Sequence, residues 1–181
     1  MKDLALHILD IAQNSTRANA SLVEIAVVED SNSHILSIAI KDNGCGMPPD
    51  MVKRVADPFV TSRTTRKVGL GIPLLKQSAE QCGGDLSIQS DVGVGTWLTV
   101  RFRLDSIDLP PWGDIAGVVA LLAAGHPEVD FIFCYTKGDC CYSFDTREVK
   151  EVLGDTPISS PQIVTFMKEM IAENLTEEGC L

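Results

Sequence analysis

The sequence predicts an α+β fold, with helices on one face of a mixed, mainly antiparallel sheet and a small α/β extension at the C-terminal end. Segments with helical periodicity alternate with segments in which every second residue is apolar. The strand-like segments come in adjacent pairs joined by short polar or glycine-containing turns, a pattern typical of antiparallel pairing. With 45% hydrophobic residues among 181, the chain can bury a sizeable core.

The first part of the chain should begin with a long helix, because Leu4, Ile8 and Ile11 recur at helical spacing. Strands follow where apolar residues alternate with polar ones, and glycines or prolines mark the boundaries. The expected order is a helix over 3–18, strands over 22–28 and 35–41, a short helix from Pro48, a helix over about 69–82, and strands around 86–88 and 98–102.

A change in charge near Asp105 divides the chain into residues 1–104 and an acidic extension, 105–181. The first part carries 11 basic and 11 acidic residues, whereas the extension carries 4 and 14 and accounts for the whole net charge of −10. The extension should contain helices over 114–124, 146–153 and 160–175 and a hairpin over 129–144. We expect it to be a small partner-binding or regulatory module. The alternative is an extra layer that completes the core.

Composition also excludes several classes of protein. The acidic balance argues against nonspecific nucleic-acid binding. The most apolar stretch, residues 115–124, is shorter than the roughly 20 residues that span a bilayer. Asp3, His7 and Asp10 interrupt any signal-peptide-like run. The six cysteines include no CxxC pair, so we expect reduced thiols in a cytoplasmic protein without membrane partners.

Polar residues form a second stripe on the first helix. His7, Asp10, Asn14 and Arg17 are spaced at i, i+3, i+7 and i+10. The Asn14 carbonyl could coordinate Mg²⁺, Arg17 could pair with phosphate, and Asp10 could accept a proton from water. The alternative is the solvated polar face of an amphipathic helix, and the helix by itself favours that alternative.

The loop from Asp42 to Met47 directly follows a predicted strand. Gly44 and Gly46 allow positive φ angles and a close approach of the backbone to a ligand. The Asp42 carboxylate could accept a hydrogen bond from an exocyclic amine such as that of adenine. An Asn-Gly hairpin turn fits less well, because prolines and a helical segment follow instead of a partner strand.

A second glycine-containing segment, Lys67-Val68-Gly69-Leu70-Gly71, opens a predicted helix. Free N–H groups and the positive end of the helix dipole would favour phosphate there. This motif is weak alone, but it follows a polar segment over 57–68 that has the character of a long functional loop. Farther on, Thr96 lies at the start of a strand, after a glycine turn that a simple hairpin would explain.

The order of these motifs resembles the gyrase, chaperone, histidine kinase and mismatch-repair (GHKL) superfamily. DIAQN, DNGCGM, DPF, GLGI and GVGT follow one another over residues 3–104. Residues 57–84 look most like a histidine kinase, and the first helix looks more like the mismatch-repair branch. The resemblance implies a Bergerat-type fold that binds ATP with Mg²⁺, with Asn14 at the metal and a lid over 61–68. The ATP-binding residues that it implies are Asn14, Arg17, Asp42, Gly44, Gly46, Met47, Thr61, Arg63, Lys67, Val68, Gly69, Leu70, Gly71 and Thr96.

Two departures from the family pattern leave the activity open. Asp10 stands where the catalytic branches usually place Glu, and no helix pair bearing a phospho-acceptor histidine is recognisable; His7 is interpreted as structural or supporting. The chain could pass a phosphoryl group to a partner protein, or hydrolyse ATP with Asp10 as the general base. The alternative to these kinase or ATPase activities is a nonenzymatic ATP-sensing switch.

Overall fold

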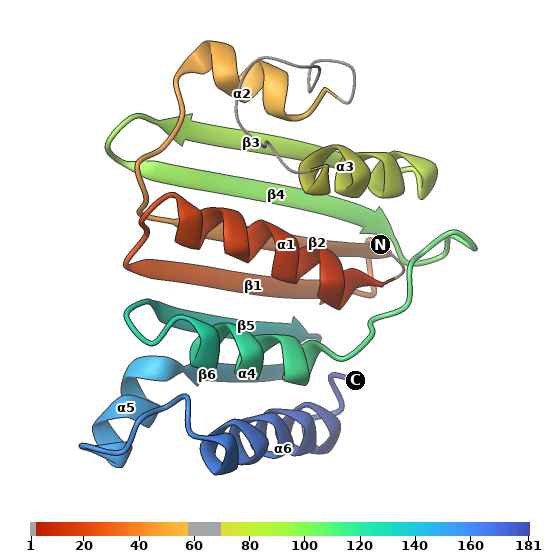
Figure 1. The fold of residues 1–181 in the computed structure, drawn as a ribbon. Coiled ribbons are helices and arrows are strands. Elements are labelled where there is room, and N and C mark those ends of the chain that lie inside the picture. Colours follow the sequence, from red (N-terminus) through yellow and green to blue (C-terminus); the bar gives the residue numbers. More distant parts are fainter. Residues whose placement is uncertain (1–2, 58–69) are drawn as a thin grey trace.

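A single six-stranded sheet extends through both parts of the chain, with strand order β3-β4-β2-β1-β5-β6 (Figure 1). The computed structural model describes residues 3–57 and 70–181. Neighbouring strands are antiparallel except β1 and β5, which are parallel. The strands are β1 (Leu22–Asp30), β2 (Ile35–Asp42), β3 (Asp85–Asp91), β4 (Gly95–Arg103), β5 (Asp130–Lys137) and β6 (Cys140–Asp145).

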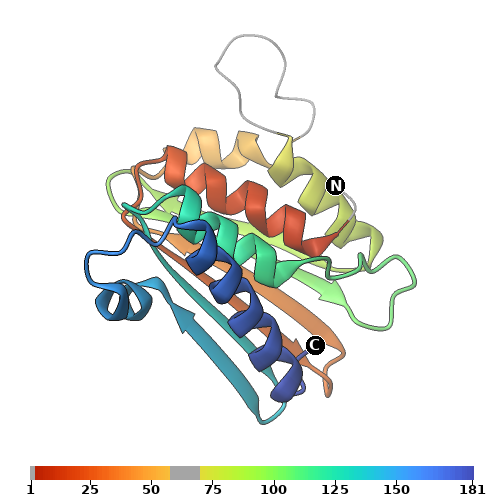
Figure 2. The same cartoon turned by 60° about the horizontal axis from the view of Figure 1, so that its bottom comes forward.

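Four helices lie side by side over one face of this sheet, in the order α3, α1, α4, α6 (Figure 2). This arrangement confirms the predicted two-layer fold, with helices on one face of a mixed sheet. In the described part of the chain, no helix is long and apolar enough to cross a membrane. The helices are α1 (Leu4–Arg17), α2 (Pro49–Val55), α3 (Gly71–Gln81), α4 (Ile115–Gly125), α5 (Thr146–Leu153) and α6 (Pro161–Glu177).

The core lies between the helix layer and the sheet. Successive side chains of a strand point to opposite faces, so Val23, Ile25 and Val27 of β1 are buried while the residues between them are not. Leu4 and Ile8 of α1 pack into the same cluster. The face of the sheet without helices is more open, and Trp97 of β4 is half exposed on it.

The acidic extension contributes strands to the same sheet as residues 1–104. Strand β5 pairs with β1 along eight positions, from Leu22 opposite Asp130 to Glu29 opposite Lys137. Phe131 and Phe133 of β5 are buried in the same cluster as the β1 side chains. These contacts favour the alternative in which the extension completes the core.

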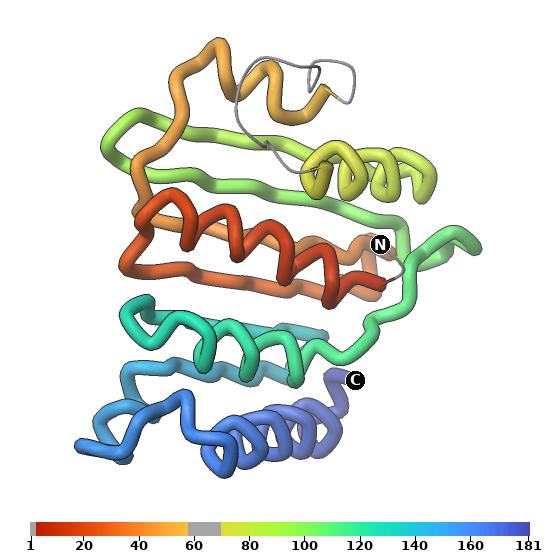
Figure 3. Tube along the Cα trace, viewed as in Figure 1, coloured from red at the N-terminus to blue at the C-terminus, as the bar shows by residue number. Residues whose placement is uncertain are grey.

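The proline-containing joint between the two parts docks on the first turn of α1. The chain leaves β4, passes the N-terminal end of α1 and enters α4 (Figure 3). The N–H groups of Leu4 and Ala5 donate to the carbonyl oxygens of Pro111 and Trp112, both at 2.9 Å. Because the first N–H groups of a helix have no partner within it, the joint supplies the missing acceptors.

A partly buried polar network adds a further link between the two parts. The Tyr135 hydroxyl donates to Glu29 at 2.9 Å, and Lys137 forms an ion pair with the same carboxylate at 3.1 Å. The Tyr135 ring packs against Trp112 with centroids 5.4 Å apart. Burial, followed by the neighbouring Glu29 carboxylate, raises the pKa of Tyr135 well above its usual range. Its hydroxyl therefore stays protonated as a donor to Glu29.

We predict that a chain ending at Leu104 does not fold cooperatively. Loss of residues 105–181 would uncover β1 and remove Phe131, Phe133 and Tyr135, three of the largest fully buried side chains. Each such side chain contributes about 1.5–3 kcal/mol, against a total stability of about 5–15 kcal/mol for a typical domain. Thermal unfolding followed by circular dichroism should lack a sigmoidal transition. A cooperative transition, with ligand binding equal to that of the full chain, would show that residues 1–104 are an independent domain.

Candidate functional site

Asp42 lies at the end of β2, where α1 crosses above the strand. Its Oδ2 accepts a hydrogen bond from the buried Ser15 hydroxyl of α1 at 2.7 Å. Its Oδ1 accepts from the backbone N–H of Gly44 at 2.9 Å. Two donors from different elements therefore fix the carboxylate in one orientation, and Thr96 of β4 is its partner across the strands.

The loop after Asp42 is tied to the start of β1 by Asn43, and its backbone lies against the end of α1. Asn43 Oδ1 accepts from the N–H groups of Ser21 and Leu22, at 2.9 and 3.0 Å. Gly44 lies so close to the end of α1 that an added Cβ would be 2.8 Å from the Ala18 carbonyl oxygen. Any larger residue at position 44 would push the loop away from the helix.

The β3–β4 hairpin holds the far end of this loop. Ser90 Oγ accepts from the Met47 N–H at 2.8 Å and is 2.9 Å from Thr96 Oγ1. Gly46 has φ +66°, and a Cβ there would overlap the Asp91 carbonyl oxygen. The structure thus brings the predicted residues Asp42, Gly44, Gly46, Met47 and Thr96 together at one end of the sheet.

The polar stripe of α1 leads from this loop toward the start of α3. Arg17 Nη1 donates to Asn14 Oδ1 at 3.3 Å. One helical turn earlier, the Asp10 carboxylate lies against Gly71, the first residue of α3, in the space that a side chain there would fill. Leu70 precedes the helix at its N-cap position. The remaining predicted site residues, Thr61, Arg63, Lys67, Val68 and Gly69, lie outside the described residues.

His7 departs from the solvated polar face that the stripe suggested as an alternative. It is 2% exposed, and neither ring nitrogen has a hydrogen-bond partner among the described residues. Burial lowers the pKa of this histidine below its ordinary 6.5. The nearby Asp3 and Asp10 carboxylates act to raise the pKa, but their effect is smaller. The imidazole is therefore neutral at pH 7.

Three residues that position the site were not singled out by the sequence patterns. Ser15 orients Asp42, Asn43 ties the loop to β1, and Ser90 joins the loop to Thr96. Ser15 lies at helical spacing from Ile8 and Ile11 on the apolar side of α1, and a hydroxyl on that side was the one available signal. The described residues contain no group of three His, Cys, Asp or Glu side chains that could hold a metal ion.

Comparison with known proteins identifies the family. The model of the family described as "Histidine kinase-, DNA gyrase B-, and HSP90-like ATPase" matches residues 2–106. The chain belongs to this GHKL family. A putative sensor protein of Shewanella frigidimarina is 32% identical over 103 residues, which are 56% of this chain and 16% of that protein. The probable C4-dicarboxylate sensor kinase of Bacillus subtilis is 36% identical over 70 residues, 39% of this chain and 13% of the kinase. The chain thus spans less than a fifth of these relatives.

Solved GHKL-like structures share the fold. The ATPase domain of Aquifex aeolicus MutL, complexed with ADP, matches with a TM-score of 0.52 and 18% identity. The likeness covers 84% of this chain and 69% of that one, a share that residues 2–106 alone could not supply. The N-terminal domain of a DNA repair protein matches with a TM-score of 0.55 and 16% identity, over 80% of this chain and 52% of that domain. The structural likeness therefore includes part of the acidic extension.

We predict that His7→Leu makes this GHKL domain less sensitive to acid. Because the folded-state pKa of His7 is lowered from 6.5, the unfolded chain binds more protons below about pH 6.5, and stability falls as the pH drops toward the folded-state pKa. Leucine removes this loss together with two unpartnered buried nitrogens. Urea unfolding at neutral pH and near pH 5 measures the effect, with His34→Asn in the exposed β1–β2 turn as control. Equal acid sensitivity of His7→Leu and the parent protein would contradict it.

Proposed function

We propose that the chain binds ATP with Mg²⁺ at this site and acts as a histidine kinase-like kinase or ATPase on or with a partner protein. The main support is the Asp42 carboxylate, which Ser15 and Gly44 hold in one orientation. The loop beside it has no room for a Cβ at Gly44 or Gly46. The six free cysteines fit a reducing compartment, and we propose the cytoplasm as the place of action.

Asp42 is suited to recognise the base. Each carboxylate oxygen can accept more than one hydrogen bond, so the bonds from Ser15 and Gly44 leave acceptor capacity for the exocyclic amine of adenine. Guanine carries a carbonyl oxygen at the equivalent position, which a carboxylate would repel. The site should therefore prefer ATP to GTP. Thr96, tied to Ser90, would hold a water or the base edge beside Asp42.

In this proposal, the phosphates of ATP bind near the N-terminal end of α3. Its N-terminal N–H groups begin at Gly71, with Leu70 at the N-cap, and by resemblance to the family Gly69, Leu70 and Gly71 would bind ATP. By resemblance to the family, Thr61, Arg63, Lys67 and Val68 would contact the phosphates from the lid. Mg²⁺ retains several non-protein ligands and needs few from the protein. Asn14 Oδ1 would be one of them, and its bond to Arg17 would then exchange for the metal, which frees Arg17 for phosphate.

Asp10 favours hydrolysis among the possible activities. Its carboxylate lies against the first residue of α3, next to the proposed phosphate site. A carboxylate there can orient a water molecule and accept its proton. A kinase that transfers the phosphoryl group to a partner, or a switch that only senses ATP, would not need this group as a base.

We predict that Asp42→Asn weakens ATP binding by about 1–3 kcal/mol, because a carboxamide turns one acceptor into a donor toward the base and toward Ser15. Isothermal titration calorimetry of the full chain with ATP and Mg²⁺ measures the effect. Asp30→Asn, at an exposed turn aspartate, is the matched control and should bind as the parent does. Equal affinity of the parent for ATP and GTP would sink the assignment of Asp42 as the base-reading residue.

We predict that Asp10→Asn lowers ATP turnover by roughly 10²–10⁴-fold, as loss of a general base does, while ATP affinity stays nearly unchanged. Release of labelled phosphate from ATP, followed beside calorimetric binding, separates the two effects. Asp139→Asn, in the exposed β5–β6 turn, controls for the loss of a negative charge. Undiminished turnover would exclude Asp10 as the base and would favour transfer to a partner protein or ATP sensing.

A further inference from the structure

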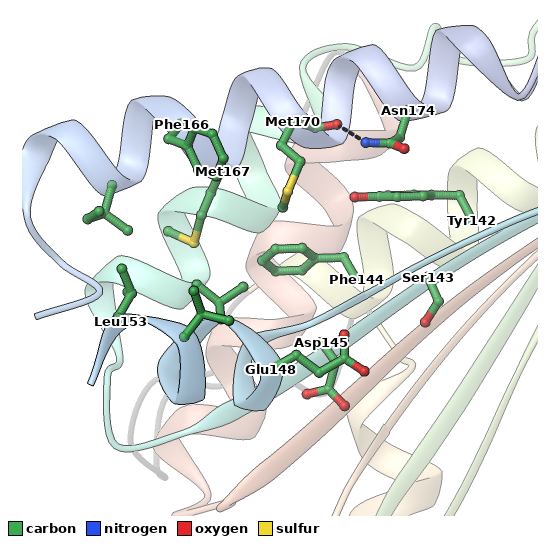
Figure 4. A pocket seen from close by; sticks show the side chains of 13 residues that line it. Tyr142, Ser143, Phe144, Asp145, Glu148, Leu153, Phe166, Met167, Met170 and Asn174 are labelled. Atoms are coloured by element: carbon green, nitrogen blue, oxygen red, sulfur yellow. Dashed lines mark hydrogen bonds between the residues drawn. The ribbon is translucent and has the colours of Figure 1, made fainter. Parts of the chain in front are cut away.

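An elongated apolar groove lies beside β6, an edge strand of the sheet, whereas Asp42 lies on the interior strand β2. The groove encloses a cavity of about 380 Å³ between β6, α5 and α6 (Figure 4). On α6 the lining extends from Ile163 to Asn174, about three helical turns. The side chains that carry the argument are Phe144 of β6, Val149 and Val152 of α5, and Phe166, Met167 and Met170 of α6.

Large apolar side chains are left in water on both walls of this groove. Phe166 of α6 is 62% exposed, and Val152 of α5 is 87% exposed. Met170 points from α6 into the groove, toward Phe144 of β6 (Figure 4). Methionine is flexible and polarisable, and it is common at surfaces that adapt to a bound segment. An apolar groove of this kind, between two helices, suits the apolar face of a third helix.

The charges around the groove indicate which kind of helix fits. All four lysines and arginines after Leu104 are already in ion pairs within the chain: Lys137 with Glu29, Arg147 with Asp145, Lys150 with Asp130 and Lys168 with Asp114.

The glutamates beside the groove have no such partners. In the described part of the chain, Glu148, Glu169 and Glu173 form no ion pair with a lysine or arginine. Glu148 lines the groove one turn before Val152, and Glu169 and Glu173 follow Phe166 at i+3 and i+7 on α6. Uncompensated carboxylates therefore border the exposed apolar side chains on both walls.

We propose that this groove docks an amphipathic helix of a partner protein, with apolar anchors flanked by lysines or arginines. Apolar contacts would supply affinity, and the flanking charges would supply orientation and a faster encounter. A second copy of this chain is a poor occupant, since each carries a net charge of −10 and would present acidic helices to the acidic groove. The proposal deepens the proposed function by naming where its partner binds, but it does not depend on ATP binding.

A pair of synthetic peptides tests the proposal on the full chain. Both carry leucines at i, i+3, i+4 and i+7; one has lysines and the other has glutamates at the remaining positions. Fluorescence anisotropy of the labelled peptides should show saturable binding of the lysine peptide, weakened by added salt, and at least about tenfold weaker binding of the glutamate peptide. No saturable binding of the lysine peptide, or equal binding of both peptides, overturns the proposal.

Substitutions at exposed positions locate the binding. Phe166→Asp and Val152→Asp should each weaken the lysine peptide at least about tenfold. Ile107→Asp is the matched control, because Ile107 is an apolar side chain, 99% exposed, outside the groove, and it should leave binding unchanged. Undiminished binding by both groove variants overturns the proposal. It is also overturned if the parent protein sediments as a dimer and the Phe166→Asp variant as a monomer, because the groove would then hold a second copy of the chain. Calorimetry with ATP on the same proteins shows separately whether the proposed nucleotide site fails.

Discussion

The packing of α1 on the centre of the sheet is the interaction on which the other parts of the structure depend. Leu4 and Ile8, on the buried apolar side of α1, belong to the same hydrophobic core as the strands and α4 of the acidic extension. From this position Ser15 reaches Asp42 at the end of β2, and Asp10 meets the start of α3. The same helix accepts the proline-containing joint at its first turn. A shift of α1 would therefore disturb the candidate site and the junction between the two parts together.

Among the residues that the structure describes, the polar side chains at the candidate site are held by hydrogen bonds and not by ion pairs. Asp42 accepts hydrogen bonds from a hydroxyl and a backbone N–H, Asn43 ties the loop to the start of β1, and Ser90 ties it to β3. Neutral donors leave the Asp42 carboxylate uncompensated by a neighbouring cation, so its acceptor capacity is available to a ligand. Beside the edge strand β6, Arg147, Lys150 and Lys168 are in ion pairs within the chain. The Asp42 loop and the β6 groove thus present different chemistry: the first offers a hydrogen-bonded carboxylate and the second exposed apolar side chains.

Local patterns predicted the helices and strands, because the spacing of apolar residues and the glycines and prolines at element boundaries are local properties of the chain. The alternation in Val23, Ile25 and Val27, and the glycines after Gln81, act within a few residues of the chain. The order of the motifs resembled that of the GHKL family, and two of its glycines, Gly44 and Gly46, lie where the backbone approaches other backbone too closely for a Cβ. Neither pattern could reveal that Ser15 bonds Asp42, since the two residues are 27 positions apart and a serine on an apolar helix side has several possible partners.

By itself, the sequence determined the family, the order of the elements and the residue types available at each turn, since these depend on local conformational preferences and on motif spacing. Tertiary structure adds that the acidic extension shares one sheet and one core with residues 1–104. The charge boundary at Asp105 suggested a separate module, but charge reports only on the surface, whereas the parallel pairing of β5 with β1 and the shared core depend on contacts between distant segments. Burial of His7 was decided in the same way, because a polar residue on a helical stripe is buried or exposed according to what packs against it.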